Sequence, residues 1–227
     1  KCLIKVINEL HVISENYIDV FRNVGGSGFP FQRISSAVVT KGPIGTRTAC
    51  VFENRVAFLG GGRNEEPSVY LGFNAQSSKI ASAEVDMILD EYTTAQLAAA
   101  TVESQVARGM LRLYVHLPDR TLVYDAIMSA KMGFPVWHTR VSAIQGYSAL
   151  RAQNFVRVND VWVVGDPASA ALGTTTKTSS RHYGEHVRTE FTTGALRAGT
   201  NGVIMNRLTL FAVTGDVESD VEPRISM

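Results

Sequence analysis

The chain has 227 residues, of which 45% are hydrophobic and 19% charged, a balance that supports a folded core and excludes a disordered polar chain. Lysine and arginine together number 22 against 21 acidic residues, so a net charge of +1 provides no general basic field for nucleic acid. No apolar run reaches the roughly 18 to 20 residues of a membrane-spanning helix, so we expect no membrane contact.

The chain opens in a strand-like segment, residues 2–7, without an initiator methionine, and we expect it to be a piece of a longer protein. A unit of strand, tight turn and strand then recurs. Short runs rich in valine, isoleucine and aromatic residues around such turns are typical of β-hairpins. The five predicted turns are Glu15–Asn16, Glu53–Asn54, Pro118–Arg120, Asn159–Asp160 and Asn201–Gly202.

The spacing of these turns indicates the fold. Successive turns are 38, 66, 40 and 42 residues apart. Propeller blades repeat with a period of about 40–45 residues. The sequence therefore predicts an all-β protein made of β-propeller-like blades of antiparallel strands, forming part of a ring.

Glycine-rich segments separate the first strands. Residues 25–30 and 60–67 contain clusters of glycine and proline and are predicted to be loops. The second loop leads into a further predicted strand at residues 68–73.

Residues 82–100 interrupt the β pattern with two short predicted helices. Ser82 can cap the first helix, and Thr93 with Gln96 matches a capping box that opens the second. Removing these 19 residues shortens the long step of 66 residues to 47, close to the other steps. We therefore interpret the segment as a helical insertion between blades.

Strand patterns return at residues 102–164 and include a strand at 135–139. Residues 168–180, rich in alanine, serine, threonine and glycine, are predicted to be an exposed loop. We expect a partial propeller domain at residues 1–214 and an acidic tail at 215–227 that frays or docks elsewhere.

One motif resembles a zinc site. His182, Glu185 and His186 match the H-x-x-E-H pattern, which needs both imidazoles on one helical face. Strand-like residues follow the motif, and on a strand the two histidines would be about 13 Å apart. That separation is too long for two ligands of one zinc ion, so we interpret the segment as a polar strand start.

Other candidate sites also have structural explanations. The glycines of 60–63 lack the helix that a phosphate loop requires, and they match only one copy of a kelch-like repeat. Asp166 precedes a proline, which is common in turns. Cys2 and Cys50 are expected to be unpaired thiols. No catalytic, cofactor-binding or metal-binding residue is assigned, and no cofactor is expected.

Several segments together resemble the packaged-DNA stabilisation protein of short-tailed phages. The resemblance runs from about residue 10 to about residue 195 and none of its segments is a catalytic motif. The similar segments are ISENYIDVF (13–21), FPFQRI (29–34), VAFLGGGRNE (56–65), VHLPDRTLVYD (115–125), PVW (135–137), RAQNFV (151–156), WVVGDP (162–167) and HYGE (182–185).

The resemblance implies a non-enzymatic structural protein of the virion tail, assembled in the host cytoplasm and also called the tail hub or nozzle. Members form a ring, a homohexamer, below the portal-bound adaptor ring. The ring retains genomic DNA in its lumen without sequence readout and provides attachment sites for the tailspike and the tail needle. Members are about twice as long, so this chain would be the C-terminal half, partnered by the missing N-terminal half.

Two other functions remain open from the residues alone. A propeller glycosidase or lyase acting on host surface polysaccharide would need carboxylates that converge at one face of the ring. A generic propeller interaction module would share the fold without any virion, since one fold serves many functions.

Overall fold

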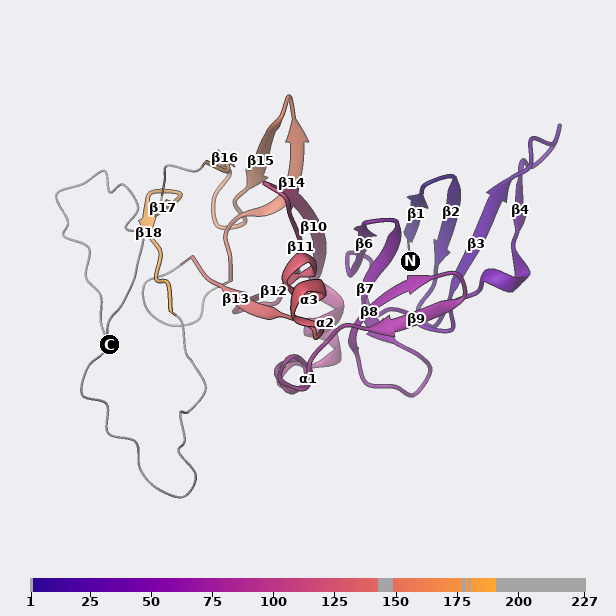
Figure 1. Ribbon diagram of the computed structural model, residues 1–227, viewed down its shortest axis with the longest axis horizontal. Helices are drawn as coiled ribbons and strands as arrows, with labels where there is room; N and C mark the ends of the chain where they lie inside the picture. The colour runs from indigo at the N-terminus through magenta and orange to yellow at the C-terminus, as the bar shows by residue number, and fades with distance from the viewer. Residues whose placement is uncertain (1, 143–148, 177–178, 180, 191–227) are drawn as a thin grey trace, which may run out of the picture.

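The computed structural model describes residues 2–142, 149–176, 179 and 181–190 (Figure 1). Within these residues, consecutive antiparallel sheets follow one another along the chain, each built as a meander of neighbouring strands. This is the architecture of β-propeller blades and confirms the predicted fold class. The predicted turn at 201–202 and the acidic tail at 215–227 lie outside the described residues.

The first blade is a four-stranded sheet whose spatial order is its sequence order. Its strands are β1 (Cys2–Val6), β2 (Glu9–Ile13), β3 (Ile18–Asn23) and β4 (Phe31–Arg33), followed by the 3-10 helix η1 (Ser35–Ala37). The glycine-rich loop at 25–30 therefore joins two strands of one blade.

The second blade pairs two short strands with one edge of a long buried strand. Its strands are β5 (Gly42–Pro43), β6 (Ala49–Phe52), β7 (Arg55–Gly61), β8 (Ser68–Phe73) and β9 (Gln76–Lys79). Helices α1 (Ala83–Leu89) and α2 (Thr94–Ala99) follow, with the Ser82 cap and the capping box of Thr93 and Gln96 as predicted. The helical insertion between blades is therefore confirmed.

The third blade again has four strands in sequence order. They are β10 (Thr101–Ala107), β11 (Met110–His116), β12 (Thr121–Asp125) and β13 (Trp137–Arg140). The sequence analysis missed helix α3 (Ala126–Met132), which joins β12 to β13. Asp125 caps this helix through the N–H of Met128, and Gly133 ends it in the left-handed conformation at φ 77°.

The last described strands form a three-stranded sheet and a small hairpin. The sheet contains β14 (Gln153–Val158), β15 (Val161–Gly165) and β16 (Leu172–Thr174), and the hairpin contains β17 (Arg181–His182) and β18 (Glu185–His186). We call the three-stranded sheet the fourth blade.

The structure corrects the register of the predicted repeat. We count β6 as the first strand of the second blade, because β5 only extends the same edge of β7. The turns at 15–16 and 118–120 then join second and third strands, whereas those at 53–54 and 159–160 join first and second strands. The equivalent first turns begin at Ile7, Glu53, Arg108 and Asn159, so blades repeat at intervals of 46, 55 and 51 residues. All four of these residues have positive φ, between 45° and 56°, as tight hairpin turns require.

Each pair of neighbouring blades is joined by its own cluster of buried side chains. Val6, Ile13 and Ile18 of the first blade pack against Val56 and Phe58 of the second. A larger apolar cluster joins the second and third blades and includes both insertion helices. The first strands of successive blades contact one another, β1 with β6, β6 with β10 and β10 with β14. The blades are therefore arranged side by side around a common axis.

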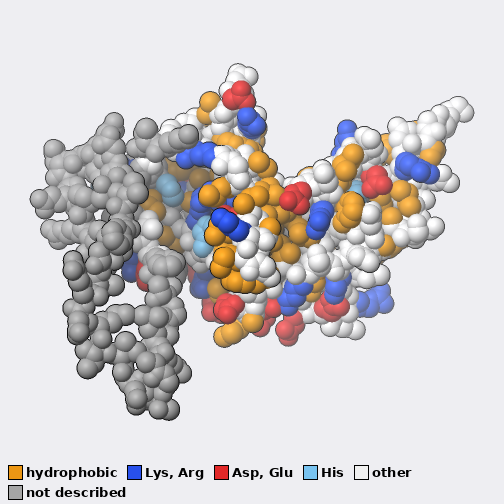
Figure 2. Space-filling model, viewed as in Figure 1, with side chains coloured by type: hydrophobic (Ala, Val, Ile, Leu, Met, Phe, Trp, Pro, Cys, Tyr) orange, Lys and Arg blue, Asp and Glu red, His pale blue; other side chains and the backbone are white. Residues whose placement is uncertain are grey.

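The first blade lies at the right end of the view, the fourth blade stands left of the middle, and the β17–β18 hairpin lies further left (Figure 1). In the space-filling view the surface is hollowed between the β14–β15 hairpin and the first blade, and hydrophobic side chains gather on both flanks of this hollow (Figure 2). Across the described part of the chain, every helix is too short or too polar to cross a membrane.

Candidate functional site

The residues of the H-x-x-E-H motif lie on a hairpin. His182 ends β17 and pairs with Glu185 of β18 across a turn at Tyr183 and Gly184. The single strand assumed for the 13 Å separation of the histidines is therefore wrong, because the left-handed φ angles of Tyr183 and Gly184 reverse the chain. Within the described ranges, no three His, Cys, Asp or Glu side chains are grouped to hold a metal ion.

The glycine loop between β7 and β8 is bonded within its own neighbourhood. The carboxylate of Glu65 accepts a hydrogen bond from the N–H of Gly62 at 3.1 Å and pairs with Lys41. Lys41 and the Gly62 N–H lower the pKa of Glu65 below its usual range. The Gly62 amide of the loop and the nearby Lys41 cation are therefore both directed at the carboxylate of the loop, as in a structural turn.

Gly60 is needed for close contact between backbones. A Cβ added there would lie 2.1 Å from the carbonyl oxygen of Gly42 and 2.7 Å from the Cα of Pro43. We expect Gly60→Ala to lower the free energy of unfolding by about 2 kcal/mol, because β5 must move away from β7. Urea denaturation would measure the change, with Gly26→Ala as the control, since a Cβ at Gly26 meets no atom within 4 Å. Equal stability of the two variants would contradict this account.

Two buried carboxylates serve local structure. Asp166 accepts two hydrogen bonds from the Arg151 guanidinium, at 3.0 and 2.5 Å, and others from the N–H of Ala168 and the hydroxyl of Ser169. The Arg151 contact holds the pKa of Asp166 well below its usual range. Asp125 caps α3 and lies 3.7 Å from Arg112. Both carboxylates are therefore engaged in turns and ion pairs.

The contact between the third and fourth blades, which we call the polar seam, depends on Glu103. Its two carboxylate oxygens accept hydrogen bonds from the N–H groups of Asn154 and Phe155, both at 2.9 Å. One of the same oxygens lies 2.8 Å from Nε2 of His116. Burial raises the pKa of Glu103, but His116 and the two N–H donors outweigh burial and lower it overall.

A β-bulge in β14 places two backbone N–H groups next to this carboxylate. The register of β14 shifts between Gln153 and Val156, and Asn154 takes a left-handed φ of 56°. Asparagine tolerates this conformation, and the bulge presents two successive N–H groups to one acceptor. Tyr114 stacks on Phe155 beside it, with ring centroids 4.7 Å apart. The polar seam thus joins the third and fourth blades by specific contacts.

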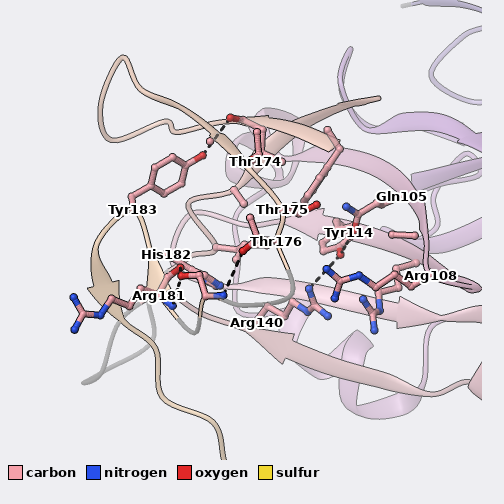
Figure 3. Close-up of a pocket in the computed structure, with 18 of the residues that line it drawn as sticks. Gln105, Arg108, Tyr114, Arg140, Thr174, Thr175, Thr176, Arg181, His182 and Tyr183 are labelled. Carbon is pink, nitrogen blue, oxygen red and sulfur yellow. Dashed lines mark hydrogen bonds between the residues drawn. The ribbon is translucent and has the colours of Figure 1, made fainter. Parts of the chain in front are cut away.

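The outer part of the polar seam opens into a cavity of about 650 Å³ (Figure 3). Arginine side chains from three places in the third blade line it: Arg108 from the β10–β11 turn, Arg112 from β11 and Arg140 from β13. The motif search missed this group because the three residues belong to no short pattern. Only the folded sheet, in which β12 lies between β11 and β13, brings them to one cavity.

Two sheet faces at the ends of the structure have no described neighbour. In the fourth blade, cross-strand pairing places four valines and Leu172 on the face turned away from the third blade. Leu172 is 78% exposed and three of the valines are 44–55% exposed. In the first blade, Leu3, Val12, Leu10 and Phe21 share the face turned away from the second blade, and Leu3 is 66% exposed.

These features define a class: a β-propeller protein whose blades are joined by structural contacts and whose first and fourth blades each have a face, rich in apolar residues, without a neighbour among the described residues. The sequence profile of one family, described as "Bacteriophage P22 Gp10, beta-propeller", matches residues 2–180. The chain belongs to this family, and is thus a structural protein of the phage tail class.

A curated relative supports the same assignment. The chain is 30% identical to the "Tail hub protein gp10" of Salmonella phage P22 over 138 residues, which are 61% of this chain and 29% of that protein. The aligned part is therefore less than a third of the length of the relative.

Proposed function

We propose that this chain is part of a tail hub or nozzle that closes the portal channel, retains packaged DNA and offers attachment sites for the tailspike and the tail needle. In this proposal the hub is a ring, a hexamer, that binds the portal-bound adaptor ring. It assembles in the host cytoplasm and acts in the virion without enzymatic activity. DNA in its lumen is held without sequence readout.

The observation that carries the proposal is the pair of uncovered sheet faces on a chain of this family. A propeller blade packs each face against a neighbour, and an apolar face left in water favours association. The valine face of the fourth blade and the Leu3 face of the first blade suit further blades. We infer that the rest of a longer hub protein, corresponding to the predicted N-terminal half, supplies them.

A propeller glycosidase or lyase is the second candidate function, and the buried carboxylates support it less than they support a structural role. Glu103, Asp125 and Asp166 are the carboxylates tied into the buried part of the described structure, and each already binds an arginine, a histidine or backbone N–H groups. A general acid needs a raised pKa, whereas Glu103 and Asp166 both have lowered values. Turnover of surface polysaccharide abolished by one carboxylate substitution would favour the enzyme over the hub.

Electron microscopy of the longer protein mixed with portal–adaptor complexes tests the hub proposal. We expect rings of several copies attached to the adaptor, and we expect the present chain alone to associate as its concentration rises in light scattering. A longer protein that remains monomeric and does not bind the adaptor would refute the proposal.

A further inference from the structure

The cavity in the polar seam has an excess of positive charge. Arg108, Arg112 and Arg140 line it, together with His182, and none of the described residues that line it is acidic. In Figure 3 the guanidinium groups of Arg108 and Arg140 lie on the same side of the cavity as Tyr114 and Gln105, whereas the guanidinium of Arg181 points away. Arg108 and Arg140 therefore share one wall of the cavity, and Arg112 also lines it.

These guanidinium groups have few partners of opposite charge. Arg140 donates a hydrogen bond to the Tyr114 hydroxyl at 3.3 Å and has no carboxylate at ion-pair distance among the described residues. Arg112 forms an ion pair with Asp125, but the 3.7 Å between them leaves its buried Nε without a hydrogen bond among the described residues. Buried charges are usually paired and hydrogen-bonded, so this arrangement calls for an anion.

The pKa shifts of neighbouring groups agree with this excess of positive charge. Burial first, and then Arg140 and Arg151, lower the pKa of His182 below its usual value. Burial also lowers the pKa of Arg140, and the charge of Arg112 adds to that effect. The charged forms of His182 and Arg140 are thus each disfavoured by a neighbouring arginine, and an anion bound between them would relieve this repulsion.

We propose that this cavity binds a carboxylate side chain of an acidic segment from a protein partner. A guanidinium group matches a carboxylate with two parallel hydrogen bonds, and Arg112 and Arg140 have donors to spare. The apolar side chains of Met110, Leu150 and Phe155 also line the cavity and suit the methylene stem of an acidic residue.

The geometry favours a protein side chain over a nucleic acid. Nucleic-acid backbones are bound by rows of surface cations, and aromatic platforms stack their bases. Here Arg112 and Arg140 are only partly exposed, and the Tyr114 ring is buried against Phe155. A single side chain can reach into such a cavity. This docking site goes beyond the proposed hub function and does not require ring formation.

Fluorescence anisotropy with a labelled eight-residue peptide of aspartate, glutamate and serine tests the proposal. We expect binding with a dissociation constant on the order of 100 µM at low salt. Arg140→Gln should weaken binding about tenfold and Arg108→Gln about threefold. Arg108 is exposed in a turn, so its variant keeps the fold testable even if Arg140→Gln unfolds. Arg55→Gln, an exposed arginine on the second blade, is the matched control and should leave binding unchanged.

Competing ligands separate the sources of the anion. The same peptide with asparagine and glutamine should not bind, and inorganic phosphate at equal concentration should displace little of the acidic peptide. Tighter, arginine-dependent binding of a 20-nucleotide single strand would overturn the proposal in favour of nucleic acid. Absence of peptide binding, or binding unaffected by both arginine substitutions, would overturn it outright.

Discussion

Replacing Glu103 with glutamine is expected to release the fourth blade from the third. The variant loses the carboxylate that lies 2.8 Å from Nε2 of His116, and one of the two N–H groups of Asn154 and Phe155 faces an amide nitrogen that cannot accept its hydrogen bond. Leaving a buried N–H donor without its acceptor costs about 1–3 kcal/mol, and with the lost carboxylate charge we expect a total loss of about 3 kcal/mol. Urea denaturation would measure it. Hydrogen exchange should show β14 and β15 losing protection first.

The control for this experiment is Glu91→Gln, because Glu91 forms an ion pair with Arg120 while 56% exposed, and such pairs contribute at most about 1 kcal/mol. The pH dependence gives a second readout. Since the pKa of folded Glu103 lies below its ordinary value of 4.5, its stabilisation is present above that value and is lost as the pH falls through the folded pKa. The difference between wild type and variant should shrink in acid. A constant difference would show that the carboxylate charge is not what joins the blades.

Individual strands could be predicted because each is a short β-branched or aromatic run with its own turn. Ser68–Phe73 is found with the same bounds as predicted, and the caps at Ser82 and Thr93 mark both insertion helices. These signals are local. Helix α3 was missed although Asp125 and Gly133 bracket it, because Asp125 also completes a strand and the segment between them is short.

The position of each predicted hairpin within its blade could not be predicted from the local sequence. A hairpin between first and second strands has the same residue pattern as one between second and third, so the turns at Glu15–Asn16 and Glu53–Asn54 look equivalent in sequence. Only pairing shows that Ile7 occupies the position equivalent to Glu53. Isoleucine is a poor marker of a left-handed turn, and the first turn was hidden for that reason.

The polar seam was equally hidden. Met110, Arg112, Tyr114 and His116 alternate with Leu111, Leu113 and Val115 along β11. Alternation predicts a strand with one apolar and one polar face, and a polar face is normally assigned to solvent. In this protein the polar face lies against another blade. The anion cavity and the Glu103 contacts both form because the polar face of β11 packs against the fourth blade.

Charge introduced on the valine face of the fourth blade is expected to prevent a further blade from packing there, and with it the assembly of the longer protein. Val156 and Val158 alternate along β14 and pair with Val163 and Val161 of β15, so they share one uncovered apolar surface. In the double variant Val156→Asp and Val158→Asp, a further blade would bury two unpaired carboxylates, each at a cost of several kcal/mol. We expect assembly of the longer protein to fall more than a hundredfold in analytical ultracentrifugation.

The same double variant should leave the present chain folded, because both valines are about half exposed, at 55% and 49%, and lie on the side away from the third blade. Its melting temperature should change by only a few degrees, and its concentration-dependent association should decrease. Met87→Asp is the matched control, since Met87 is 70% exposed on α1, away from both terminal faces. If Met87→Asp blocks assembly as strongly, or if the valine variant assembles normally, the fourth blade does not use this face to bind a neighbour. The polar seam with the third blade would then be the last blade-to-blade contact of the ring.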